Sequence, residues 1–137
     1  MRDLGTSSRV MALESLVRTI EEWRSRGLRW GVAVGAFDLP HAEHARRLIS
    51  IRSRVDRLVA LVTEDAWTAE KLGDGHPVSP AADRARVVAG LRMVDAVAIV
   101  APGDVPTLQG ALQTAEVWGD VEDAGAERWR RLRGERP

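Results

Sequence analysis

The fold is decided by residues 29–44, which read RWGVAVGAFDLPHAEH. The first part, residues 29–35, is a short β-branched run bounded by glycine, and it predicts a buried strand. From His41 to about Arg52 the apolar residues follow the spacing of one helix face. A glycine turn between a strand and a helix start presents backbone N–H groups and the positive end of the helix dipole. The stretch therefore predicts an anion-binding site.

Outward from this stretch, helix and strand patterns alternate along the chain. Strand patterns occupy residues 57–63, 96–100 and briefly 116–118, and helix patterns occupy about 13–23, a segment after residue 80, and about 105–115. We expect Ser7 or Ser8 to cap the first helix, and Ser79 with Pro80 to open the helix that follows them. The alternation predicts an α/β fold: a doubly wound, mostly parallel, Rossmann-like sheet of about four strands with helices on both faces.

Composition limits the classes of protein that this sequence can encode. The chain has 137 residues, with 20 basic and 20 acidic side chains, three histidines and no cysteine. A hydrophobic fraction of 45% can fill a core, which argues against disorder. The balanced charge argues against a nucleic-acid partner. The lack of cysteine excludes disulfides and thiolate metal sites.

The domain organisation follows from length and local charge. We expect a single domain over residues 1–137, with residues 1–10 as candidates for disorder and residues 121–137 as an arginine-rich terminal helix. Apolar runs such as residues 58–62 are far too short to cross a bilayer, and no apolar stretch follows a basic start. The expected location is therefore the cytoplasm, without a membrane partner.

His41 and His44 carry the chemistry that this stretch offers. Their spacing of three residues puts both imidazoles on one face of the first helical turn. Imidazoles above a helix N-terminus can bind phosphate oxygens and stabilise charge that develops on them. The alternative is that both are surface or half-buried histidines without a role. A zinc site is disfavoured because it needs at least three protein ligands, and no residue is assigned to a metal.

Residues 35–44, GAFDLPHAEH, resemble the G-x-F-D-x-x-H-x-G-H signature of the cytidylyltransferase-like nucleotidyltransferases. The heptose-phosphate adenylyltransferase and glycerol-3-phosphate cytidylyltransferase types are the most similar in style. Further pieces follow in the family's order: Val62-Thr63-Glu64-Asp65, the single lysine Lys71, Pro77-Val78-Ser79-Pro80 with Asp83-Arg84, Leu91-Arg92-Met93-Val94-Asp95, and Trp118-Gly119-Asp120. The likeness extends over roughly residues 11 to 133, and its order is more specific than any single piece.

The resemblance implies a nucleotidyltransferase. In such an enzyme a phosphorylated small molecule attacks the α-phosphate of CTP or ATP, Mg²⁺ neutralises the triphosphate, and pyrophosphate leaves. The implied catalytic residues are His41, His44, Lys71 and Arg92. The implied nucleotide contacts are Gly35, Ala36, Phe37, Asp38, Asp65, Gly119 and Asp120. Besides the two substrates, a homodimer partner or a second subunit is expected.

Two departures from the family pattern support an alternative function. The glycine between the two histidines is Glu43 here, which puts bulk and negative charge where the nucleotide would approach the helix. No serine or threonine follows Thr114, so an S-T-T-like segment that binds the triphosphate is not found. The arginines of residues 128–133 either replace those contacts or form a solvated helix face. The alternative is a catalytically impaired module that binds a nucleotide, a phosphate or a partner protein.

Overall fold

The computed structural model describes residues 9–38 and 42–120, except for the side chains of Lys71, Val105, Trp118 and Asp120. The described residues contain one parallel sheet with strands β1 (Trp30–Gly35), β2 (Arg57–Thr63), β3 (Ala96–Val100) and β4 (Val117–Asp120). The strand order is β3-β2-β1-β4. β1 therefore lies inside the sheet, hydrogen-bonded to β2 on one side and to β4 on the other.

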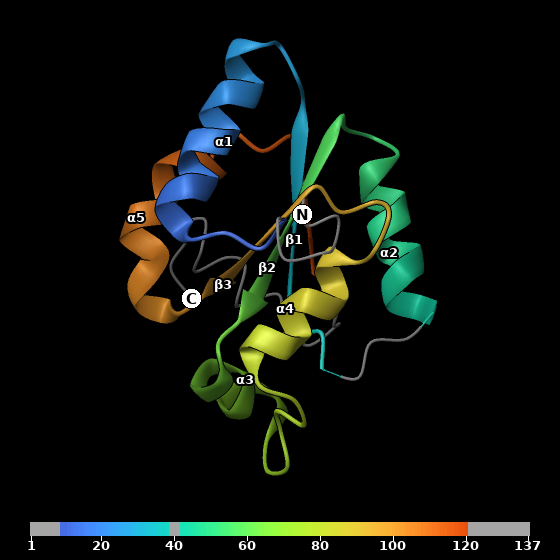
Figure 1. Cartoon of the computed structure of the whole chain (residues 1–137), viewed down its shortest axis with the longest axis vertical. Helices are drawn as coiled ribbons and strands as arrows, with labels where there is room; N and C mark the ends of the chain where they lie inside the picture. Colours follow the sequence, from blue (N-terminus) through green and yellow to red (C-terminus); the bar gives the residue numbers. More distant parts are fainter. Residues whose placement is uncertain (1–8, 39–41, 121–137) are drawn as a thin grey trace, which may run out of the picture.

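Helices cover both faces of this sheet. On one face lie α1 (Leu13–Ser25) and α5 (Val105–Leu112), on the other α2 (Ala42–Arg52) and α4 (Ala81–Ala89) (Figure 1). The short helices α3 (Asp65–Leu72) and η2 (Pro102–Asp104) follow the carboxyl ends of β2 and β3. The chain moves from β1 to β3 in one direction and returns to β4 in the other. Crossovers of one hand then place α5 on the face opposite α2 and α4.

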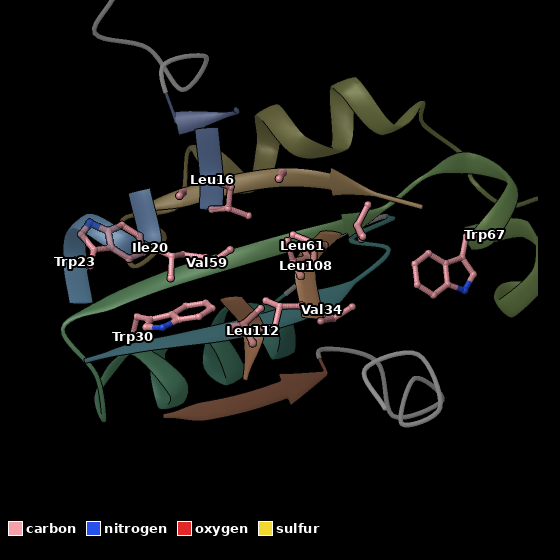
Figure 2. Packing of buried hydrophobic residues seen from close by; sticks show 14 residues of the cluster. Leu16, Ile20, Trp23, Trp30, Val34, Val59, Leu61, Trp67, Leu108 and Leu112 are labelled. Carbon is pink, nitrogen blue, oxygen red and sulfur yellow. The ribbon is translucent and has the colours of Figure 1, made fainter. Parts of the chain in front are cut away.

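The two faces bury separate apolar cores, because successive strand residues point to opposite sides. In β1, Val32 and Val34 face α1 and α5, whereas Ala33 faces α2. Figure 2 shows the first core, in which Leu16, Ile20 and Trp23 of α1 lie over the strands. Both faces of the strands are buried, which explains their nearly continuous apolar sequences.

The segment before α1 contacts the outer side of β3. Val10 forms a parallel bridge with Val97, and the Met11 N–H donates to the Val97 carbonyl at 2.9 Å. A single Arg9 nitrogen donates to the carbonyl oxygens of Ala89, Leu91 and Val94. Arg9 and Val10 are the last residues of the segment 1–10 that the sequence marked as a candidate for disorder. Residues 1–8 of that segment lie outside the described residues.

The predicted α/β, doubly wound class is confirmed, and the strands at 57–63 and 96–100 have the predicted bounds. The predicted caps are wrong. Ala12 precedes α1 and Pro80 precedes α4, neither with a side-chain hydrogen bond. Helix α3 was not predicted, because it is only eight residues long and has no clear apolar face. The expected helix at 121–137 lies outside the described residues.

Among the described residues, no helix is both long enough and apolar enough to cross a membrane.

Candidate functional site

The strand order identifies where on the sheet a ligand would bind. That place is the carboxyl ends of the parallel strands, which together form the carboxyl edge of the sheet. The chain leaves β1 toward β2 and later returns to the other side of β1 as β4. In open α/β sheets a ligand binds outside the carboxyl ends of the strands at such a reversal. The residues at that point are Gly35, which ends β1, and Asp120, which ends β4.

The loop after β1 is buried and held in an unusual backbone conformation. Ala36 and Phe37 have no exposed surface, and Phe37 has a φ of 53°, in the left-handed region. Such conformations cost energy in a non-glycine residue and cluster at functional sites. The Phe37 ring meets the His44 ring of α2 edge to face, with the centroids 6.3 Å apart. His44 is 6% exposed, so this imidazole lies at the junction of the β1 loop and α2.

Asp38 connects this loop to the 76–79 loop that precedes α4. Its side chain is fully buried and accepts hydrogen bonds from His76 Nδ1 at 2.8 Å, Val78 N at 2.7 Å and Ser79 N at 3.2 Å. Burial opposes the charge of Asp38, yet the hydrogen bonds from His76, Val78 and Ser79 outweigh it and lower the pKa of this carboxyl. The carboxylate is therefore stable at neutral pH and fixes the 76–79 loop.

Arg84 of α4 connects the same loops and strand ends through hydrogen bonds. Its side chain is buried, and its guanidinium donates to the carbonyl oxygens of Ala36 at 2.7 Å and Thr63 at 2.8 Å, at the carboxyl ends of β1 and β2. It also donates to the Ser79 carbonyl at 2.8 Å, to Thr68 Oγ1 at 3.3 Å and to Asp65 Oδ1 at 2.6 Å. One buried cation thus joins two strands, α3 and the 76–79 loop.

Glu43 does not lie in a buried position. Its carboxylate is 2.8 Å from Arg46 and 3.4 Å from Arg47, on the next turn of the same helix, and its side chain is 44% exposed. Hydrogen bonds from Arg46 and then Arg47 lower the pKa of Glu43. The negative charge that the sequence analysis placed near the nucleotide is therefore compensated on the helix itself.

Several predicted site residues are brought together at this edge. They are Gly35, Ala36, Phe37, Asp38, His44 and Asp65. The carboxylates of Asp38 and Asp65 bind protein groups: Asp38 binds the 76–79 loop, and Asp65 binds Arg84 and the Ala81 N–H. Their contact with a nucleotide stays a prediction.

Arg92 is not brought to this edge, contrary to the sequence-based expectation. Helix α4 begins beside Asp65 at the carboxyl edge and runs back along the sheet. Arg92 is exposed in the turn that follows, and Asp95 already hydrogen-bonds Leu58 at the start of β2. The length of α4 therefore carries Arg92 to the amino ends of the strands, opposite the site.

Gly119 has a packing role in this structure. It lies in β4 opposite Ala33, and a Cβ at this position would overlap the Ile51 side chain of α2. Glycine thus allows α2 to pack closely on β4. The prediction of a nucleotide contact at Gly119 has no support from this geometry.

The side chains of three further predicted site residues are not among the described parts of the structure. His41 lies outside the described residues, and Lys71 and Asp120 are described only as parts of α3 and β4, without their side chains. Their roles stay predictions.

Two residues of the site were given no site role from the sequence, although Arg84 lies in the family-like piece Asp83-Arg84. Besides that resemblance, Arg84 had a second signal, because it lies four residues before Val88 on the apolar face of its helix, where an arginine is out of place. His76 had none, since its contact with Asp38 joins residues 38 positions apart.

The described residues do not build a resident metal site. No group of three histidine, cysteine, aspartate or glutamate side chains in this part of the chain could hold a metal ion. Mg²⁺ at phosphate-transfer sites is bound largely by substrate phosphates and water, so it would arrive with a triphosphate.

Comparison with known proteins now identifies the family. Residues 32–135 match the family described as cytidylyltransferase-like. The chain belongs to the cytidylyltransferase-like family. This confirms the resemblance seen in GAFDLPHAEH, and the family's match includes every predicted site residue.

The chain is also similar to the bifunctional protein HldE of several bacteria. It is 42% identical over 90 residues to the bifunctional protein HldE of Gluconacetobacter diazotrophicus, a match that covers 66% of this chain and 18% of that protein. HldE of Granulibacter bethesdensis is 36% identical over 93 residues, with 68% and 19% covered. The chain thus spans less than a fifth of the length of these relatives.

A solved structure supports the fold. The lipopolysaccharide core biosynthesis protein of Thermoplasma volcanium is similar with a TM-score of 0.54 and 22% identity, over 68% of this chain and 96% of that one. This cytidylyltransferase-like chain and that protein share the α/β architecture.

Proposed function

We propose that this chain is a nucleotidyltransferase that moves a nucleotidyl group from CTP or ATP to a small phosphorylated acceptor. An oxygen of the acceptor phosphate would form a bond to the α-phosphorus, and the bond from that phosphorus to the bridging oxygen of the β-phosphate would break. Pyrophosphate leaves with the electron pair, so no bond to the protein is needed. The observation that carries the proposal is the family's signature stretch, placed at the reversal point of the sheet.

The chain's own residues would act by positioning and charge. The backbone N–H groups at the start of α2 would bind triphosphate oxygens, because a helix start attracts anions. His44, together with His41, would stabilise the charge that develops on the transferred phosphate. Lys71 would bind the triphosphate. Arg92 is left out of the proposal, because it lies at the opposite edge of the sheet.

The nucleotide would be supplied as its Mg²⁺ complex, with the metal held by the phosphates. We further propose that the protein acts as a homodimer or with a second subunit, and that it is located in the cytoplasm. Both proposals rest on the sequence.

A catalytically impaired binding module is the second candidate. Glu43, in the position of the family's glycine, favours it, because a side chain there narrows the approach of a nucleotide to the helix. The ion pairs that draw Glu43 toward Arg46 and Arg47 favour the enzyme instead.

Pyrophosphate release separates the two candidates. The full chain is incubated with CTP or ATP and a panel of sugar and polyol phosphates, beside a nucleotidyltransferase of known activity. The proposal predicts release with at least one pair. If calorimetry detects nucleotide binding and no pair reacts, the binding module is correct. If no nucleotide binds, the enzyme and a nucleotide-binding module are both wrong, and the second candidate is reduced to a module that binds a phosphate or a partner protein.

A further inference from the structure

His76 is the one histidine of the carboxyl edge that the proposed function does not use. It lies in the loop between α3 and α4, and its side chain is 34% exposed, whereas the Asp38 side chain that it contacts is fully buried. Its ring therefore extends from a buried partner toward the surface.

Asp38 fixes the orientation of this ring. An ionised carboxylate only accepts hydrogen bonds, so His76 Nδ1 must carry a proton in their 2.8 Å contact, whether or not Nε2 is also protonated. The other ring nitrogen, Nε2, makes no hydrogen bond to any residue in the described ranges 9–38 and 42–120. A histidine held by one nitrogen and open at the other is oriented to bind a ligand.

The loop that carries His76 is rigidly attached to the proposed nucleotide loop. Asp38 accepts from Val78 N and Ser79 N, and Arg84 donates both to the Ser79 carbonyl and to the Ala36 carbonyl beside Phe37. His76 is thus placed beside Asp38, three residues after the end of β1.

The charged groups near His76 do not exclude an anion from its Nε2 side. Asp38 is engaged by three donors, and Asp65 is paired with Arg84. Asp74 is exposed two residues earlier in the loop. The same segment begins in α3 with Lys71, the only lysine of the chain.

We propose that His76 is a substrate-binding residue that, as an imidazolium with both ring nitrogens protonated in the complex, donates a hydrogen bond from Nε2 to a phosphate group, and that Asp38 is the positioning residue that holds it. The inference rests on the proposed function and adds to it a residue outside the family's signature stretch. The phosphate belongs either to the nucleotide or to the acceptor, and two probes distinguish these sources.

Calorimetry on the full chain tests the binding role. Pyrophosphate serves as the probe for the nucleotide side and glycerol 3-phosphate as the probe for the acceptor side. We expect His76→Ala to weaken one of them by about ten-fold, the loss of one charge-assisted hydrogen bond. The control is Val78→Ala in the same loop, a residue that is 57% exposed and hydrogen-bonds Asp38 through its backbone N–H, and it should bind as the wild type does.

A double-mutant cycle tests the positioning role. Asp38→Asn should weaken the same probe in the wild-type background and add nothing in the His76→Ala background, because Asp38 acts through His76. An equal effect in both backgrounds would overturn the role of Asp38. The Nε2 resonance of His76 in ¹⁵N-labelled protein, identified by its loss in His76→Ala, should move when the probe is added.

The outcomes separate this inference from the proposed function. If the wild type binds a probe and His76→Ala binds it equally well, the role of His76 is wrong and the proposed function stands. If the wild type binds neither probe nor any nucleotide, both are wrong. Circular dichroism on each variant excludes unfolding as the cause, and His76→Gln gives a second variant if His76→Ala does not fold.

Discussion

At the scale of single residues, the carboxyl edge depends on a buried arginine whose partners are mostly backbone. Arg84 makes five hydrogen bonds, three of them to carbonyl oxygens of different segments. A buried guanidinium is costly unless its donors are paired, and here the pairing joins the strand ends that would bind a ligand. Its role is therefore to position the site.

Replacing Arg84 tests this role. Arg84→Met keeps the length of the side chain but leaves the carbonyls of Ala36, Thr63 and Ser79 without this donor, which should lower the free energy of unfolding by about 3 kcal/mol. Arg86→Met on the same helix is the control, because its side chain is 66% exposed, and it should change stability by less than about 0.5 kcal/mol. Urea denaturation measures both. Equal losses would show that Arg84 has no special role.

Asp38 gives the stability a defined pH dependence. Its pKa is lowered in the folded state from the usual 3.8, so the unfolded chain binds more protons in that range. The stabilisation by this carboxylate is complete above the unfolded pKa and is lost as the pH falls through the folded pKa. Asp38→Asn should therefore be less stable than the wild type by about 2 kcal/mol at neutral pH, the value of hydrogen bonds to a charged group.

The measurement is urea denaturation of both proteins at a series of pH values. The difference between them should shrink as the solution is acidified below about pH 4. A difference that stays constant down to the acid transition would contradict the assignment.

At the scale of elements, close packing of α2 on β4 is the contact that sets the geometry of the reversal point. Ile51 of α2 lies against Gly119, and it also approaches the position that a Cβ would take at Gly31 of β1. Two glycines on adjacent strands thus form the surface on which α2 rests. The start of this helix, with His44, is placed by that contact.

Adding a methyl group at Gly119 should separate α2 from the sheet. Gly119→Ala is expected to lower the free energy of unfolding by about 2 kcal/mol through overpacking. Ile51→Val, which removes the clashing methyl, should recover part of the loss in the double variant. Gly110→Ala in α5 is the control, because nothing lies within 4 Å of its added Cβ. It should stabilise the protein by about 0.5 kcal/mol or more. Thermal denaturation measures all four proteins.

Part of the fold could be predicted from the sequence alone. The strands were predictable because each is a short apolar run buried on both faces. The anion site expected after β1 stays a prediction from the turn that follows the strand. The hydrogen bonds of Asp38 and Arg84 were not predictable, because they join segments that are distant in sequence. Arg92 was misplaced because a motif does not tell at which edge of the sheet a helix ends.

At the scale of the whole molecule, we expect the carboxyl and amino ends of the parallel strands to have different roles. The carboxyl edge holds the left-handed turn at Phe37, the buried His44 and the 76–79 loop. The amino edge holds the Asp95 contacts with Leu58 and the exposed Arg92. Function is expected at the first edge only.

Two substitutions compare the edges directly. His44→Gln should lower kcat for pyrophosphate release by about 100-fold, the typical effect of removing one group that stabilises transition-state charge. Arg92→Ala should leave kcat and KM within about two-fold of the wild type, as expected for an exposed side chain remote from the chemistry. Steady-state kinetics with the reactive substrate pair measure both, and melting temperatures check folding. A large loss in Arg92→Ala would place it at an active site, in this chain or in a partner.

The contact of Arg9 and Val10 with β3 and the end of α4 has a consequence for how the protein is produced. Three carbonyl groups and the outer side of a strand are satisfied by Arg9, Val10 and Met11, which precede the first helix. A shortened version that starts at α1 would leave that strand open to pair with another molecule. Truncation at the first helix would therefore yield a protein that self-associates, and fusion tags should be joined ahead of residue 9.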